Sequence, residues 1–164
     1  MFETALEFVL GWEGGLSDHP DDPGGLTHHG ITHGTLERWR GQALDPEETR
    51  NLTLQEAGAI YRKEYWDQCS CDALPDPVAL LVFDCAVNQG PGAAARILQS
   101  ALGVTVDGAI GPQTLGAAGQ ADVDSLVDEI VALRAVRYAH TEKPMFYKGW
   151  FRRLTAAHRA AIEL

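Results

Sequence analysis

The chain of 164 residues contains little cysteine and no long apolar run. Its three cysteines, Cys69, Cys71 and Cys85, are too few and odd in number for a disulfide framework. The one-residue gap between the first two is too tight for a typical zinc pair, so we expect reduced thiols. The longest apolar run, residues 78–87, includes Asp84 and is far shorter than the roughly 20 residues of a membrane-spanning helix. The sequence therefore predicts no stable membrane insertion.

Basic side chains are also scarce, with 13 lysines and arginines against 23 aspartates and glutamates, and the formal net charge is −10. Nucleic-acid binding needs a basic surface that neutralises phosphates, so this balance argues against it. With 45% hydrophobic residues, the chain can form one compact domain or two small lobes that share a core.

The chain does contain a succession of helical patterns. The expected helices cover residues 2–13, 31–39, 53–66, 78–88, 93–102 and 123–141, a short segment after Pro112, and residues 146–163. Thr53 and Glu56 have the spacing of a capping box, and the apolar segment 78–88 is expected to be the central buried helix. Residues 16–30 are rich in Asp, Pro, Gly and His, which is typical of an irregular loop or a short hairpin. The expected fold class is mainly α, in an α+β arrangement.

Glu13 stands out because of its position on the first expected helix. The apolar face of that helix contains Phe2, Leu6, Val9 and Leu10. At about 100° per residue, Glu13 projects into the middle of this face. A carboxyl group on the core side of a helix costs free energy unless it is paired or functional. The pattern thus predicts either a buried structural acid or a general acid that apolar surroundings keep protonated.

Several short motifs occur in a particular order. They are Glu-Gly-Gly-Leu at 13–16, Asp-Pro-Gly-Gly-Leu-Thr at 22–27, Gly-Ile-Thr at 30–32, Tyr-Arg-Lys-Glu-Tyr-Trp at 61–66, and Asp-Cys-Ala-Val-Asn-Gln-Gly-Pro-Gly at 84–92. This ordered set resembles glycoside hydrolase family 108, whose members are N-acetylmuramidases. The segment from residue 92 onward, with Val-Asp-Gly-Ala-Ile-Gly-Pro-Gln-Thr-Leu at 106–115, resembles the peptidoglycan-binding region of that family. The chain departs from the family at Leu16 and at His28-His29, where aromatic residues and an Asn-aromatic pair are usual.

The resemblance implies a lysozyme-like fold, with a small N-terminal lobe that carries the loop or hairpin and a larger helical lobe. It implies a catalytic region at 1–91 and a helical, peptidoglycan-binding region at 92–164, packed into one unit. The implied reaction is hydrolysis of the β-1,4 bond between N-acetylmuramic acid and N-acetylglucosamine, with Glu13 as general acid. Asp22 and Thr27 would hold the attacking water, which predicts inversion at the anomeric carbon. Asp18 and Asp21 compete with Asp22 for this role.

Three further residues are candidates for substrate binding. The amide of Asn88 can hydrogen-bond a sugar, although the same residue could simply end a helix. Gln89 and Tyr61 are weaker candidates, and Tyr61 is better suited to the core than to a sugar platform. Asp84, inside the apolar segment, is expected to pair with an internal donor.

Other functions remain open at this level. A related domain could bind glycan without cutting it, and a lytic transglycosylase would cut the same bond with a different product. His29 and His33 have the spacing of two zinc ligands on one helical turn, as in a zinc amidase. However, Gly30 and Gly34 interrupt that turn, so solvated histidines are the default and we expect no metal and no cofactor.

The cellular setting is an expectation of the same kind. The first residues, Met-Phe-Glu-Thr, lack the basic segment of a secretory signal. Together with the resemblance, this favours a phage or prophage endolysin that is made in the host cytoplasm, released through a holin, and active on the wall in the periplasm. A phage-tail domain or a bacterial secreted effector would have a similar sequence. We expect a monomer whose partner is bacterial peptidoglycan.

Overall fold

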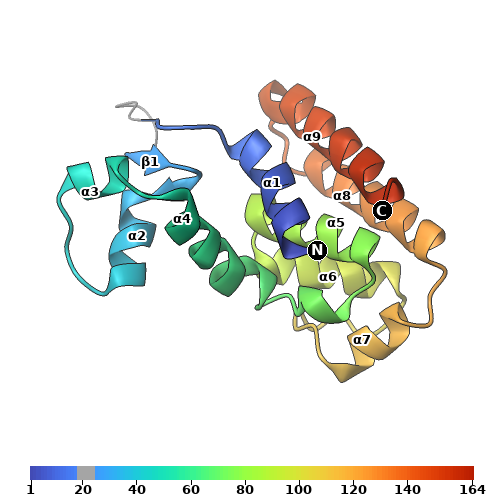
Figure 1. The fold of residues 1–164 in the computed structure, drawn as a ribbon. Coiled ribbons are helices and arrows are strands. Elements are labelled where there is room, and N and C mark those ends of the chain that lie inside the picture. The colour runs from blue at the N-terminus through green and yellow to red at the C-terminus, as the bar shows by residue number, and fades with distance from the viewer. Residues whose placement is uncertain (18–24) are drawn as a thin grey trace.

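The computed structural model describes residues 1–17 and 25–164 of the chain. Within them, the fold is mainly helical with one two-stranded antiparallel sheet (Figure 1), as the sequence predicts. The elements are α1 (Phe2–Glu13), β1 (Thr27–His28), β2 (Ile31–Thr32), α2 (His33–Arg40), α3 (Pro46–Arg50), α4 (Leu54–Tyr61), the π-helix η1 (Arg62–Trp66), the 3₁₀-helix η2 (Cys71–Ala73), α5 (Asp76–Gln89), α6 (Pro91–Ala101), α7 (Pro112–Ala118), α8 (Val123–Ala139) and α9 (Pro144–Ile162). None of the helices formed by these residues is long and apolar enough to cross a membrane.

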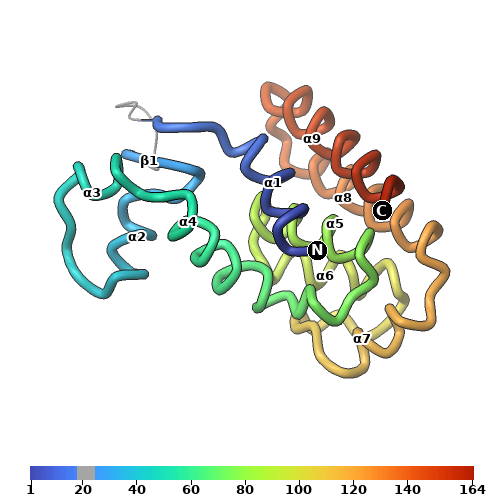
Figure 2. The backbone as a smooth tube through the Cα atoms, in the orientation of Figure 1, coloured from blue at the N-terminus to red at the C-terminus, as the bar shows by residue number. Residues whose placement is uncertain are grey.

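The elements form two lobes, and the larger one is built around a buried helix. In Figure 1, the sheet and α2 to α4 make a small lobe, and the remaining helices gather around α5. Helix α5 is buried continuously from Val78 to Ala86, and α1, α6, α8 and α9 all pack against it. This confirms the expectation of a central buried helix. The tube in Figure 2 shows α4 and the chain after it running from the small lobe back to the helices around α5.

Side-chain caps begin α2, α3, α4 and α8. Thr32 accepts a hydrogen bond from the backbone N–H of Thr35, and Thr53 accepts one from that of Glu56. The capping box expected at Thr53 is only half formed, because the Glu56 carboxylate pairs with Arg40 instead of returning to the cap. The complete capping box lies in α3, where Asp45 is the cap. That short helix was not among those expected from the sequence.

Several helix boundaries differ from those expected by a few residues, and two of the differences change the type of structure. The helix expected from residue 31 begins at His33, because Ile31 and Thr32 form the second strand of the hairpin. The helix expected from Thr53 to Trp66 changes to a π-helix at Arg62. At the end of that segment, Trp66 is fully buried and its indole N–H donates to Asp72, 2.9 Å away. A strictly α-helical period therefore does not describe this part of the chain.

The three thiols are free and buried, which leads to a prediction. Burial raises the pKa of Cys85 to about 11 and its side chain is 1% exposed. We expect Cys85 in the native protein at pH 8 to react at least about 100-fold more slowly with a disulfide reagent than in the denatured chain, since both thiolate and access are limited. Mass spectrometry of labelled peptides measures this rate. Equal rates in the two states would contradict the buried position.

Candidate active site

Glu13 is the last residue of α1, where Gly14 ends the helix with a φ of +77°. Its side chain is 24% exposed, so the carboxylate is partly buried and still reaches solvent. Arg153 of α9 donates a hydrogen bond from Nη1 to Glu13 Oε1 at 2.5 Å. The two residues are 140 positions apart in the sequence, and their contact joins the start and the end of the fold.

The turn of the hairpin packs directly against Glu13. His29 and Gly30 form the turn with positive φ values of +50° and +74°. A Cβ atom at Gly30 would lie 2.8 Å from Glu13 Cβ and would overlap the hydroxyl oxygen of Tyr61, so only glycine fits. The Tyr61 hydroxyl donates to the carbonyl of His29 at 3.1 Å. Burial, and then the charge of Glu13, raise the pKa of Tyr61, which therefore remains a proton donor to the turn.

Behind Glu13, a chain of polar contacts runs through the core. Arg153 Nε donates to Asp84 Oδ1 at 2.7 Å, and Arg134 Nη2 donates to Asp84 Oδ2 at 2.7 Å. Arg134 also lies 3.3 Å from the hydroxyl of Tyr138, which donates to Asn88 Oδ1 at 2.7 Å. Asp84 and Arg134 are fully buried, and a charge there is tolerated only because it is paired. The expected internal partner of Asp84 is confirmed.

The nearest contact of Glu13 differs from the sequence expectation. Apolar surroundings were expected, but the group against the carboxylate is the guanidinium of Arg153, so that expectation is wrong. Burial alone would lower the pKa of Arg153, yet the charges of Asp84 and Glu13 raise it, and the side chain keeps its proton. Since Asp84 also pairs with this cation, the positive charge is shared between two carboxylates and not devoted to Glu13 alone.

Of the other predicted catalytic residues, the structure describes Thr27 but not Asp22. Thr27 lies in β1, where it pairs with Thr32 across the sheet, and forms a bridge with Ser17. Its hydroxyl donates to the carbonyl of Gly25 at 3.3 Å. The same hairpin carries the turn that touches Glu13, so Thr27 belongs to the element beside the acid. Asp22, with its competitors Asp18 and Asp21, lies outside the described residues.

The predicted binding residues divide between a pocket and the core. Asn88 and Gln89, at the end of α5, line a pocket of roughly 200 Å³ together with Tyr138 and Trp150, whose rings stack at 5.1 Å. The side-chain nitrogen of Gln89 is buried and has no hydrogen-bond partner among the described residues. Tyr61, by contrast, is only 1% exposed. The structure assigns it to holding the hairpin turn, which matches its interpretation as a core residue.

The histidines of the hairpin region have protein partners. The Nδ1 atom of His28 lies 3.2 Å from the carbonyl of Thr49, and that of His33 lies 2.7 Å from the Thr49 hydroxyl. The rings of His28 and His29 stack at 4.0 Å, and burial, together with the charge of His28, lowers the pKa of His29. Residues 1–17 and 25–164 contain no cluster of three His, Cys, Asp or Glu side chains that could hold a metal ion.

Sequence reasoning missed the partners of the acid. Arg153 and Tyr138 looked like ordinary helical residues, although they complete the path from Glu13 to Asn88. A signal existed for Arg134, which has helical spacing with Val127, Ile130 and Val131. A cation on an apolar face, opposite an acid in another apolar helix, indicates a buried ion pair. Nothing in the local sequence distinguishes Arg153 from the adjacent Arg152.

Comparisons with known proteins cover nearly all of the chain. The family described as Glycosyl hydrolase 108 matches residues 6–90, and the Predicted Peptidoglycan domain matches residues 93–155. Among solved structures, SagA of Brucella abortus is similar, with 36% sequence identity and a TM-score of 0.89. The similarity covers 99% of this chain and 94% of that one. No curated protein matches the chain.

The close packing at the turn yields a prediction about stability. Gly30→Ala and Gly41→Ala both place a side chain on backbone with positive φ, +74° and +70°, at a cost of about 1 kcal/mol each. Only at Gly30 does the new Cβ meet Tyr61 and Glu13, since Gly41 has no neighbour within 4 Å. We expect Gly30→Ala to lower the free energy of unfolding by at least about 1 kcal/mol more than Gly41→Ala, as overpacking does. Urea denaturation followed by circular dichroism measures both.

A second substitution isolates the cause. Tyr61→Phe removes the hydroxyl oxygen that the new Cβ would overlap, so the double variant Gly30→Ala/Tyr61→Phe should recover part of the additional loss. Equal destabilisation of the two alanine variants, or no recovery in the double variant, would contradict the packing described for the turn.

Proposed function

Because the chain belongs to the glycosyl hydrolase 108 family, and is thus a glycoside hydrolase of the muramidase type, we propose that it hydrolyses the β-1,4 bond between N-acetylmuramic acid and N-acetylglucosamine. Peptidoglycan is its partner, through the region that the family of peptidoglycan domains matches. The proposal assigns the general acid to Glu13. The observation that carries this assignment is a partly exposed carboxylate, fixed at a helix end between a guanidinium group and a glycine turn.

The contacts of Glu13 suit an acid that must act at one point in space. Arg153 and the Gly30 turn limit where the carboxyl group can move, and such fixed geometry is what proton transfer to a leaving oxygen requires. Because Arg153 is also bound by Asp84, protonation of Glu13 leaves the guanidinium with a carboxylate partner. The carboxyl group can therefore give up and regain a proton without leaving a buried cation unpaired.

The second half of the reaction needs a group on the other side of the sugar. We assign it to Asp22 and Thr27, which would hold and activate the water, with inversion at the anomeric carbon. This assignment is supported by the sequence spacing and by the position of Thr27 in the strand next to the turn that touches Glu13. Asn88 and Gln89 would contact the substrate from the end of α5.

We also propose a setting for this activity. Its substrate forms the bacterial wall, so the wall in the periplasm is where the protein would act. The family resemblance supports a phage or prophage endolysin that reaches the wall through a holin and works as a monomer. A bacterial effector acting on the same wall would have the same chemistry.

The role of Glu13 is tested by Glu13→Gln. Removal of a general acid lowers rates by between about 100-fold and 10,000-fold, so we expect at least the smaller loss in reducing ends released from purified peptidoglycan. Glu7→Gln, on the same helix but exposed, is the matched control and should retain the wild-type rate. Thermal unfolding of both variants shows whether the fold is kept. Substantial activity in a folded Glu13→Gln protein would remove Glu13 as the acid.

The products also distinguish the other reactions. An anhydro-muramic end, seen by mass spectrometry, would indicate a lytic transglycosylase. New amino groups and sensitivity to chelators would indicate a zinc amidase. Binding to the wall without any product would indicate a module that holds glycan.

The second carboxylate is tested by three parallel variants, Asp18→Asn, Asp21→Asn and Asp22→Asn. We expect only Asp22→Asn to reduce hydrolysis, by about 100-fold or more, since the other two would leave the water-activating base in place. Proton NMR of the first products should show the α anomer, as inversion at a β bond requires. A β product, or an equal loss in all three variants, would overturn this assignment.

A further inference from the structure

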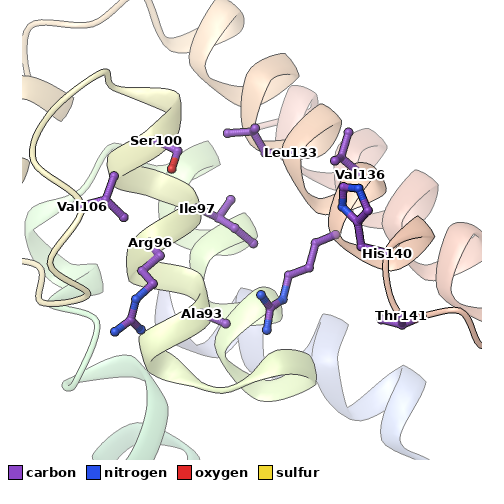
Figure 3. Close-up of a pocket in the computed structure, with 10 residues that line it drawn as sticks. Ala93, Arg96, Ile97, Ser100, Val106, Leu133, Val136, His140 and Thr141 are labelled. Atoms are coloured by element: carbon purple, nitrogen blue, oxygen red, sulfur yellow. The ribbon is translucent and has the colours of Figure 1, made fainter.

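A second hollow lies in the large lobe, between α6 and α8 and away from Glu13. It is a groove of about 550 Å³, lined by ten residues. Figure 3 shows Ile97 of α6 and Leu133 of α8 pointing into the space between these helices. Val106 and Val136, which are 47% and 52% exposed, extend its apolar wall to the rim. The whole groove lies within residues 93–155, which match the peptidoglycan domain.

The charged residues of this groove are all of one sign. Arg96 comes from α6 and Arg137 from α8, His140 also lines the groove, and none of the ten lining residues is acidic. This is unusual in a chain with a net charge of −10. A local basic groove on an acidic protein selects anionic ligands, because the surrounding surface repels them.

Arg96 is held in place by the backbone around it. Its Nη1 donates to the carbonyl of Gly92 at 3.0 Å, and its guanidinium lies so close to Gly108 that a Cβ there would come within 2.8 Å of Cζ. Gly108 has a φ of +86°, which side chains rarely adopt. Hydrogen bonds from Ala109 and Gln99, and then the charge of Arg96, lower the pKa of Asp107, so one carboxylate already acts on this exposed guanidinium. The contacts with Gly92 and Gly108 limit where the guanidinium can move.

The groove shares two residues with the pocket that contains the predicted binding residues. Arg137 and Thr141 line both this groove and the smaller pocket that contains Asn88, Gln89 and Trp150. Asn88 in turn is joined to Glu13 by the polar chain through the core. A peptide that leaves a glycan bound near Asn88 would thus meet Arg137, which lines both hollows.

We propose that this groove binds the peptide stem of peptidoglycan, with Arg96 and Arg137 pairing with its carboxylates. The stem branches from the muramic acid unit, carries several carboxylates, and presents alanine methyl groups that match the apolar wall formed by Ile97 and Leu133. The inference rests on the proposed function, because it assumes that the glycan lies at Glu13. It assigns the C-terminal region a direct part in choosing peptide-bearing glycan.

The test compares two substrates, soluble glycan strands that carry peptide stems and the same strands after an amidase has removed them. We expect Arg96→Ala and Arg137→Ala each to lower kcat/KM on the peptide-bearing strands by roughly 10-fold, the usual effect of losing one charge-assisted hydrogen bond. On bare strands the loss should stay below about 2-fold, and the change should be in KM and not in kcat. Arg159→Ala, an exposed arginine of α9 outside the groove, is the control and should match the wild type on both.

The outcomes separate this inference from the proposed function. An equal loss on the two substrates, or no loss on either, would overturn the stem-binding groove while leaving the hydrolase in place. Release of no reducing ends by the wild type would reject the proposed function instead. Binding is then measured by calorimetry in the Glu13→Gln protein, with a disaccharide tetrapeptide and the bare disaccharide as probes. Tighter binding of the first, lost in Arg137→Ala, supports the groove, and equal binding of both rejects it.

Discussion

The fold and the proposed active site both depend on the buried pairing of Asp84 with Arg134 and Arg153. Asp84 lies on the central helix α5, and its two partners come from α8 and α9, so one carboxylate fixes the positions of three helices. Removing one member of such a buried pair typically costs about 3–5 kcal/mol, because the other charge is left without compensation. The same contact also places the guanidinium that holds Glu13. A substitution that weakens this buried pairing would therefore also change the position of the guanidinium beside Glu13.

Much of the architecture could be predicted because it depends on local signals. The positions of α1, α5, α6, α8 and α9 follow from apolar periodicity, and Gly14, Thr32 and Thr53 mark helix ends through caps that act within a few residues. The helix predictions were wrong where the local pattern did not determine the structure. Arg40 draws the Glu56 carboxylate away from its cap, and the chain changes to a π-helix at Arg62.

The candidate site could be predicted only in part, for the same reason. Glu13 was singled out as a candidate because an acid on an apolar helix face is visible in the sequence itself. Its partner Arg153 was not, since no spacing rule relates residues so far apart, and an apolar environment was expected in its place. Tyr61 lies between these two cases. A sequence motif made it a candidate for substrate binding, but it is buried in the core and its hydroxyl holds the hairpin turn.

The long separation between Glu13 and Arg153 also fixes an order of events during synthesis. Glu13 leaves the ribosome early, whereas its partner is added 140 residues later, on α9. Until that helix docks against α5, the acid has no guanidinium beside it and Asp84 lacks one of its two cations. Contacts of such sequence separation form late in folding, because the loop-closure entropy must first be overcome. A nascent chain thus carries an incomplete arrangement around Glu13, and the proposed chemistry would begin only once α9 is in place.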